Sequence, residues 1–121
     1  MKKIEAIIKP FRLEDVKVAL AHLGIDSMTV TEVKGCGHQK GRSEYYNGAE
    51  HTVEFLPKLR IDLVLPDSQV REAINAIVQV AKTGKIGDGK IFISTIEEVV
   101  HIRNGEKGVL DLALAGQNHH I

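Results

Sequence analysis

The sequence predicts an α+β fold in which two helices cover one face of a single sheet. Three observations lead to this prediction: an isoleucine-rich strand and a helix pattern near the start, the same order of elements repeated in the second half, and a polar insert between the halves. Two βαβ units that share one sheet form the ferredoxin-like βαββαβ sandwich. The 121 residues are enough for one such domain with a core of its own.

The first half contains two predicted strands around a helix. Residues Lys2 to Lys9 are rich in isoleucine and are closed by Pro10, which is typical of a strand. Acidic residues in the first turn and Gly24 after the last turn mark a helix whose apolar residues are Leu13, Val16, Leu20 and Leu23. A second strand is predicted from Met28 to Lys34, where β-branched residues are enriched.

The second half repeats this order. Alternating apolar residues from Leu59 to Leu65 predict a strand with one buried face. Pro66-Asp67-Ser68 supplies an N-cap for a helix that runs until Gly84, with the apolar stripe Val70, Ala73, Ile74, Ile77 and Ala81. Two short strands, Ile91 to Ser94 and Val99 to Arg103, are predicted to close the pattern.

Composition and charge exclude several classes of protein. The 16 basic and 16 acidic residues balance, and aromatic residues make up only 4 % of the chain, which disfavours a nucleic-acid-binding protein. The start, MKKIEAIIKP, is too short and too charged for a signal peptide or a membrane span. The single cysteine, Cys36, excludes an intramolecular disulfide and suits a reducing compartment. We therefore expect a cytoplasmic domain that neither binds nucleic acid nor inserts into a membrane.

The run from Thr83 to Ile93, TGKIGDGKIFI, is the strongest candidate for a binding loop. Its three glycines let the backbone approach a ligand, and successive N–H groups can form an anion-binding concavity. Lys90 adds a point charge for a phosphate group at the edge of that concavity. The run matches neither the P-loop nor the dinucleotide-binding pattern. A glycine-rich turn that only joins a helix to a strand is the open alternative.

Other polar residues give weaker signals. In the last predicted strand, alternation places His101 and Arg103 on one face, where the arginine could reach a phosphate group or simply face solvent. Lys58 could pair with a carboxylate, and Gln39 offers an oxygen suited to hydrated Mg²⁺. The six histidines show no metal-ligand spacing and no catalytic constellation emerges. Cys36 is expected to be a small apolar residue lining a pocket, since no basic cluster near it indicates a reactive thiol.

Three segments of the chain also resemble a known family. MKKIEAIIKPFRLEDVKVAL, SMTVTEVKG and TGKIGDGKIFI occur in the order and at the spacings of the PII nitrogen signal-transduction proteins, and the resemblance runs from Met1 to about Glu106. It implies a ferredoxin-like homotrimer that binds ATP or ADP between subunits and, with Mg²⁺ and ATP, 2-oxoglutarate. Residues 1–106 would be the domain, residues of about 37–55 its partner-docking T-loop, and residues 107–121 a C-terminal extension. Partners would be enzymes, transporters or kinases of nitrogen metabolism.

The resemblance also implies site residues. The positions that correspond to the nucleotide site are Thr29, Gly37, His38, Gln39, Val64, Gly87, Asp88, Gly89, Lys90, His101 and Arg103. Those for 2-oxoglutarate are Gly37, Gln39, Lys40, Gly41, Lys58 and Gly87, with Gln39 also a ligand of Mg²⁺.

Several positions depart from the family pattern. His51 replaces the tyrosine that relatives modify, so no uridylylation is expected there, and Ala49 replaces a serine that some relatives phosphorylate. His38 and His101 replace arginines that face phosphate groups. Because histidine is mostly neutral above pH 7 whereas arginine stays charged, we expect a weakened preference for ATP, with relatively strong ADP or AMP binding. The open alternative is that Lys40, Arg42 or Arg103 compensates for the lost charge.

A binding regulator without turnover is therefore the predicted function. The open alternative is a divergent PII paralogue that senses ADP or AMP, lacks the 2-oxoglutarate response and covalent modification, and regulates a transporter or enzyme outside core nitrogen control. An acylphosphatase-like hydrolase would need an arginine–asparagine pair around phosphate, which is not marked here. An RNA-binding domain would need aromatic residues on the central strands, where the chain has only Phe92. We also expect a homo-oligomer, because the helices leave one sheet face uncovered.

Overall fold

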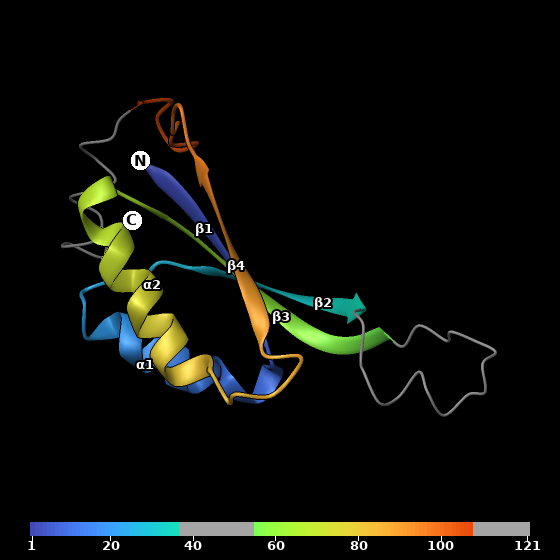
Figure 1. The fold of residues 1–121 in the computed structure, drawn as a ribbon. Coiled ribbons are helices and arrows are strands. Elements are labelled where there is room, and N and C mark those ends of the chain that lie inside the picture. Colours follow the sequence, from blue (N-terminus) through green and yellow to red (C-terminus); the bar gives the residue numbers. More distant parts are fainter. Residues whose placement is uncertain (37–54, 108–121) are drawn as a thin grey trace.

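The computed structural model describes residues 1–36 and 55–107, and these form the expected α+β sandwich (Figure 1). In chain order the elements are β1 (Lys2–Ile8), a 3₁₀ turn (Pro10–Arg12), α1 (Leu13–Ala21), β2 (Thr29–Cys36), β3 (Phe55–Leu65), α2 (Asp67–Ala81) and β4 (Gly89–Thr95). This is the βαββαβ order that the sequence predicts. Both helices lie on the same side of the sheet (Figure 1).

The four strands form one antiparallel sheet in the order β2-β3-β1-β4. The register pairs Ile4 with Leu63 on β3 and with Ile93 on β4, which brings the apolar positions of the three strands onto one face. Beyond the helices, β2 and β3 continue as a two-stranded ribbon that ends at the pair Cys36 and Phe55 (Figure 1). Both strands are longer than predicted, because the backbone groups of each find hydrogen-bond partners on the other as far as this pair.

The core lies between the sheet and the two helices. The predicted stripe of α2 is buried throughout, as are the predicted apolar residues of β3 from Ile61 onward. On α1, Val16 and Leu20 are buried, whereas Leu23 lies beyond the helix in a turn that ends at Gly24. Hydrophobic burial on one face of each element is thus the main force that sets this arrangement.

The predicted side-chain cap of α2 is wrong. The helix begins at Asp67, its cap residue is Pro66, and no side chain caps it. The Asp67 carboxylate instead accepts a hydrogen bond from the N-terminal ammonium of Met1 at 2.7 Å. This bond and the nearby Lys2 hold the pKa of Asp67 below its ordinary value. A charge-assisted bond to another element has therefore replaced the local cap.

The predicted last strand, Val99 to Arg103, is also wrong. In the part of the chain that the structure describes, this segment is a turn with one β-bridge, between Val100 and Lys107. The backbone N–H groups of His101 and Gly105 bond within the turn, and Ile102 is 100 % exposed. The strand alternation that would have placed His101 and Arg103 on one face is therefore absent.

The sheet face away from the helices is mixed in character. Register places Glu5, Arg60 and Asp62 there, and Arg60 contacts both carboxylates at 3.7 and 3.2 Å. Phe92 lies on the same face and is 54 % exposed. A partner for this face would therefore need to satisfy charged groups as well as cover apolar area. Among the described helices, none is long and apolar enough to cross a membrane.

Candidate functional site

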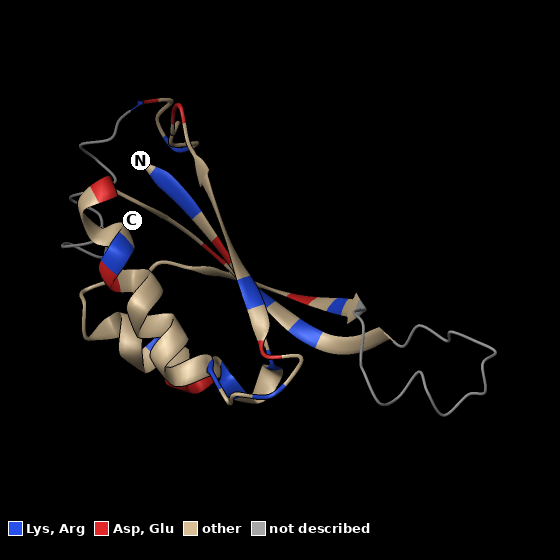
Figure 2. Ribbon diagram, in the orientation of Figure 1, with Lys and Arg blue, Asp and Glu red and all other residues tan. Residues whose placement is uncertain are grey.

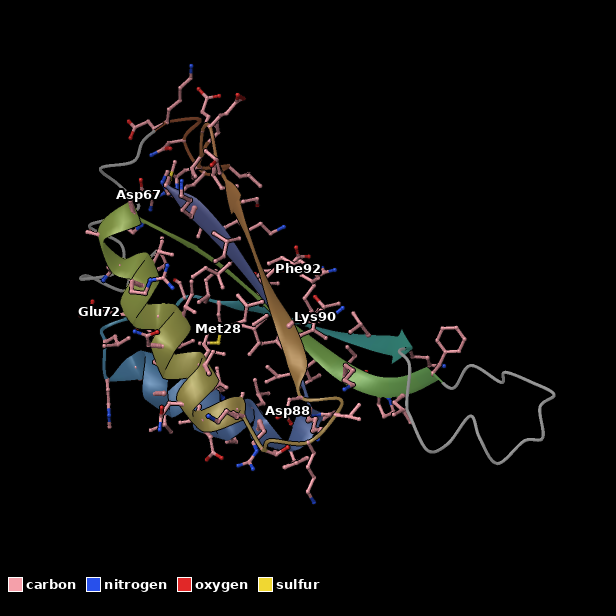
Figure 3. All side chains as sticks on the ribbon, in the orientation of Figure 1. Met28, Asp67, Glu72, Asp88, Lys90 and Phe92 are labelled. Carbon is pink, nitrogen blue, oxygen red and sulfur yellow. The ribbon has the colours of Figure 1, made fainter. Side chains whose placement is uncertain are left out.

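The loop between α2 and β4 is held closed by the side chain of Asp88. One carboxylate oxygen accepts hydrogen bonds from the backbone N–H groups of Thr83 and Gly84, each at 2.8 Å. The other accepts from the Thr83 hydroxyl and lies 3.3 Å from the ammonium of Lys9. These partners, the Thr83 hydroxyl first, hold the pKa of Asp88 well below its ordinary value, against partial burial, which raises it. Figure 3 shows Asp88 at the foot of β4.

The hydrogen bonds also determine which backbone groups a ligand can reach. The amides of Thr83 and Gly84 donate to Asp88, and the amide of Lys85 donates to the Thr83 hydroxyl at 3.2 Å. The backbone N–H groups in the first half of the loop thus already have hydrogen-bond acceptors within the protein. An anion-binding concavity would have to use the second half, from Ile86 to Lys90.

The end of the loop is fixed by a close contact between Gly89 and β1. Gly89 has φ +116° and pairs with Ile8. A Cβ atom built there would lie 1.8 Å from the carbonyl oxygen of Ile7. Only glycine permits this approach, which places Lys90 as the second residue of β4, beside Ile7.

Lys58 connects the β2–β3 ribbon to this loop. Its ammonium donates a hydrogen bond to the carbonyl oxygen of Gly87. Burial, together with the charge of Lys9, lowers the pKa of Lys58, while the Asp88 carboxylate opposes that shift. The side-chain stem passes Gly35, where a Cβ atom would lie 3.2 Å from Lys58 Cγ. Lys58 is thus partly sheltered, rather than a free charge at a strand end.

The predicted site residues fall into two groups at opposite ends of the sheet. Lys58 and the run from Gly87 to Lys90 lie at one end, with Lys58 and Lys90 on the uncovered face. Thr29 and Val64 lie at the other end, where Asp62 pairs with Thr29 and Lys3 with Val64. Val64 lies six positions after Lys58 along β3, which is a distance of about 20 Å.

His101 and Arg103 belong to the second group. The turn that carries them follows β4, and the chain just before it bonds to Met1, which lies beside the end of β3. Figure 1 shows this turn next to the N-terminus and far from the loop after α2. Within one protomer the predicted site residues therefore lie in two separate groups.

Several predictions lie outside the described residues. These concern Gly37, His38, Gln39, Lys40, Gly41 and His51, together with the extension. Cys36 ends β2, but its side chain is also outside the description. Among the described residues, no group of three or more His, Cys, Asp and Glu side chains could hold a metal ion.

A largely apolar pocket of about 440 Å³ lies between α2 and β4. Its walls include Ile74, Ile77, Val78 and Ile93, and it meets the predicted phosphate site at Asp88 to Lys90. Lys90 is one of the residues that line this pocket, whereas Lys58 is not among them.

Two residues of this site, Lys9 and Thr83, were not recognised from the sequence. From the sequence, Thr83 is only the first residue of the glycine-rich run and Lys9 only the last residue of a predicted strand. A threonine five residues before an aspartate, across two glycines, is a signal that could have indicated a side chain closing a loop. No comparable local signal links Lys9 to Asp88, which is 79 positions away.

Comparison with known proteins identifies the family. Residues 1–106 match the nitrogen regulatory protein P-II family. Curated relatives named nitrogen regulatory protein P-II include that of Azospirillum brasilense, which is 63 % identical over 108 residues, covering 89 % of this chain and 96 % of the relative. That of Mesorhizobium japonicum is 62 % identical over 109 residues, covering 90 % and 97 %. The resemblance seen in the sequence is confirmed: the chain belongs to the nitrogen regulatory protein P-II family, whose members are signal-transduction regulators of nitrogen metabolism.

Proposed function

We propose that the protein senses adenine nucleotides and 2-oxoglutarate in clefts between the subunits of a homotrimer. Through residues 37–55 it would control enzymes, transporters or kinases of nitrogen metabolism. The observation that carries the nucleotide part is the closed loop between α2 and β4, with Lys58 and Lys90 on the same sheet face beside it. Figure 2 shows basic residues both on the loop and on the segment that follows β1.

The chemistry of this end of the sheet suits a phosphate group. The backbone from Ile86 to Lys90 contains Gly87, which has a positive φ and no side chain to block a ligand. Lys90 is exposed and supplies a positive charge. Because amides fixed in place need little reorganisation, they bind an anion better than a loose loop would. ATP and ADP are the ligands that the family resemblance implies for such a loop.

The trimer is supported by the division of the site residues between two ends of the sheet. A nucleotide that used both groups would have to lie between the end of one protomer that carries Lys90 and the end of another that carries Val64. Such a contact joins two different surfaces, and contacts of this kind close into rings when the rotation permits. The trimer is the ring that the family resemblance implies.

The 2-oxoglutarate site would combine Lys58 with residues of the 37–54 segment. The Lys58 ammonium can pair with a carboxylate, which would compensate for its partial burial. Gln39 is the one protein ligand proposed for Mg²⁺. A single amide oxygen suits this ion, because Mg²⁺ keeps several waters and is often bound through the oxygens of a substrate. The remaining ligands would come from the nucleotide and 2-oxoglutarate.

Lys90→Ala tests the nucleotide proposal. We expect it to weaken ADP binding roughly tenfold or more, because one charge-assisted contact to phosphate is lost. The melting temperature should not change, since Lys90 is exposed. Isothermal titration calorimetry on both proteins measures the affinity.

Lys85→Ala is the matched control. Lys85 lies in the same loop and is also exposed, but its backbone amide faces Thr83 rather than the ligand side. Equal losses in the two variants would mean a general charge effect, and unchanged affinity in Lys90→Ala would mean that the loop is only a connector.

A further inference from the structure

The carboxylate of Asp88 is occupied by groups of the protein rather than being available to a ligand. Its partners come from separate elements: Lys9 follows β1, Thr83 follows α2, and Asp88 itself precedes β4. The side chains of Lys9 and Asp88 are 21 % and 23 % exposed, so water screens this ion pair less than a surface pair. The three residues therefore tie the two ends of the loop to the end of β1.

The hydroxyl of Thr83 has a central place in this cluster. It donates to Asp88, accepts from the amide of Lys85 at 3.2 Å, and lies 3.5 Å from the Lys9 ammonium. A hydrocarbon side chain of the same shape would leave the Lys85 amide without this acceptor and remove one donor from Asp88. The inward-facing half of the loop depends on that one oxygen atom.

We propose that Lys9 and Thr83 are positioning residues for phosphate binding, which act through Asp88 to hold the loop between α2 and β4 in its binding shape. Neither residue needs to touch the ligand. With Asp88 held in place, the amides of Thr83, Gly84 and Lys85 face inward and the backbone after Ile86 is left for an anion. The inference rests on the proposed nucleotide function and assigns a role to two residues outside the predicted site.

Thr83→Val and Thr83→Ser form the decisive pair of variants. Valine keeps the shape and removes the hydroxyl, whereas serine keeps the hydroxyl. Lys9→Met removes the charge of the second positioning residue, and Lys17→Met is its control, because Lys17 pairs with Glu14 on the exposed side of α1. All variants are made in the whole 121-residue chain.

Two measurements are needed on each variant. Calorimetry with ADP should show affinity weakened roughly ten- to a hundred-fold in Thr83→Val and Lys9→Met, the effect of losing one hydrogen bond to a charged group. Thr83→Ser and Lys17→Met should stay close to the unmodified protein. Without nucleotide, amide hydrogen exchange should accelerate at Thr83, Gly84 and Lys85 in the two weakened variants, while the core strands keep their protection.

The inference is overturned if Thr83→Val binds ADP as tightly as the unmodified protein, or if the loop amides of the weakened variants exchange at unchanged rates. It is also overturned if Thr83→Ser loses as much affinity as Thr83→Val, since the hydroxyl would then be irrelevant. Failure of the unmodified protein to bind ADP is a different result, because it contradicts the proposed function itself and the inference that depends on it.

Discussion

At position 89 the backbone of β4 passes so close to β1 that a side chain has no room. Gly89→Ala would place a Cβ atom 1.8 Å from the Ile7 carbonyl oxygen, at φ +116°. We expect a loss of more than about 3 kcal/mol in the free energy of unfolding, because displacement of the strand adds to the strain of a positive φ. Urea denaturation measures this loss.

Gly84→Ala is the control for that substitution. Gly84 also has a positive φ, +84°, but a Cβ atom there meets nothing within 4 Å. The free energy of unfolding should fall by about 1–2 kcal/mol, from backbone strain alone. Similar losses at the two positions would show that the contact with Ile7 is not what requires glycine at position 89.

Single residues also show what the sequence could and could not predict. The glycine-rich run was recognised because its composition has a direct backbone meaning. The sequence could not predict that the Asp88 carboxylate closes the loop, since the motif gives the position of Asp88 and not its hydrogen-bond partners. Lys58 was predicted to pair with a carboxylate, and the structure instead shows a bond to the Gly87 carbonyl, which depends on how β3 and the loop meet. The carboxylate partner remains a prediction.

At the scale of elements, the loop between α2 and β4 should make the free energy of unfolding of the protein depend on pH. The folded state lowers the pKa of Asp88 below its ordinary value of 3.8, so its ionised form stabilises the fold above about pH 4, and this contribution is lost as the pH falls toward the lowered pKa. Thr83→Val removes the main cause of the shift. It should therefore be less stable than the unmodified protein at neutral pH, with the difference shrinking as the pH falls below 4.

Unfolding in urea between pH 2 and pH 7 measures this difference. Thr83→Ser should follow the unmodified protein at every pH, because its hydroxyl can still donate to Asp88. A difference for Thr83→Val that is the same at pH 2 and pH 7 would mean that the loss comes from packing and not from the ionised carboxylate.

Elements were predictable where burial fixes them. The alternation from Leu59 to Leu65 and the stripe on α2 identify faces that pack on each other, and both were found as predicted. The segment from Val99 to Arg103 has a similar alternation but only one bridged residue, because a strand also requires a neighbour that accepts its register.

A proline inside β3 is tolerated for a similar reason. Pro57 pairs with Lys34 of β2 and lies beyond the end of β1. Because β1 does not reach this point, the missing N–H group of Pro57 removes no hydrogen bond between β3 and β1.

At the scale of the whole molecule, the division of the predicted site residues between the two ends of the sheet makes a prediction about mixed oligomers. Lys90→Ala damages the end that carries the loop, and Arg103→Ala damages the end that carries the turn after β4. If each nucleotide lies between the loop end of one subunit and the turn end of another, both variants alone should bind ADP weakly. Oligomers that contain both should nevertheless regain intact sites, each built from the undamaged ends of two different subunits.

Co-expression of the two variants with different affinity tags provides such oligomers, and light scattering gives their subunit number, which we expect to be three. Random mixing of equal amounts should restore about a quarter of the sites to full affinity, because each cleft needs one undamaged end from each of its two subunits. A site contained within one protomer would show no recovery, since every protomer in the mixture carries a damaged residue. Recovery of tight sites in the doubly tagged oligomers, and their absence from either variant alone, would thus place the nucleotide between subunits without requiring a structure of the complex.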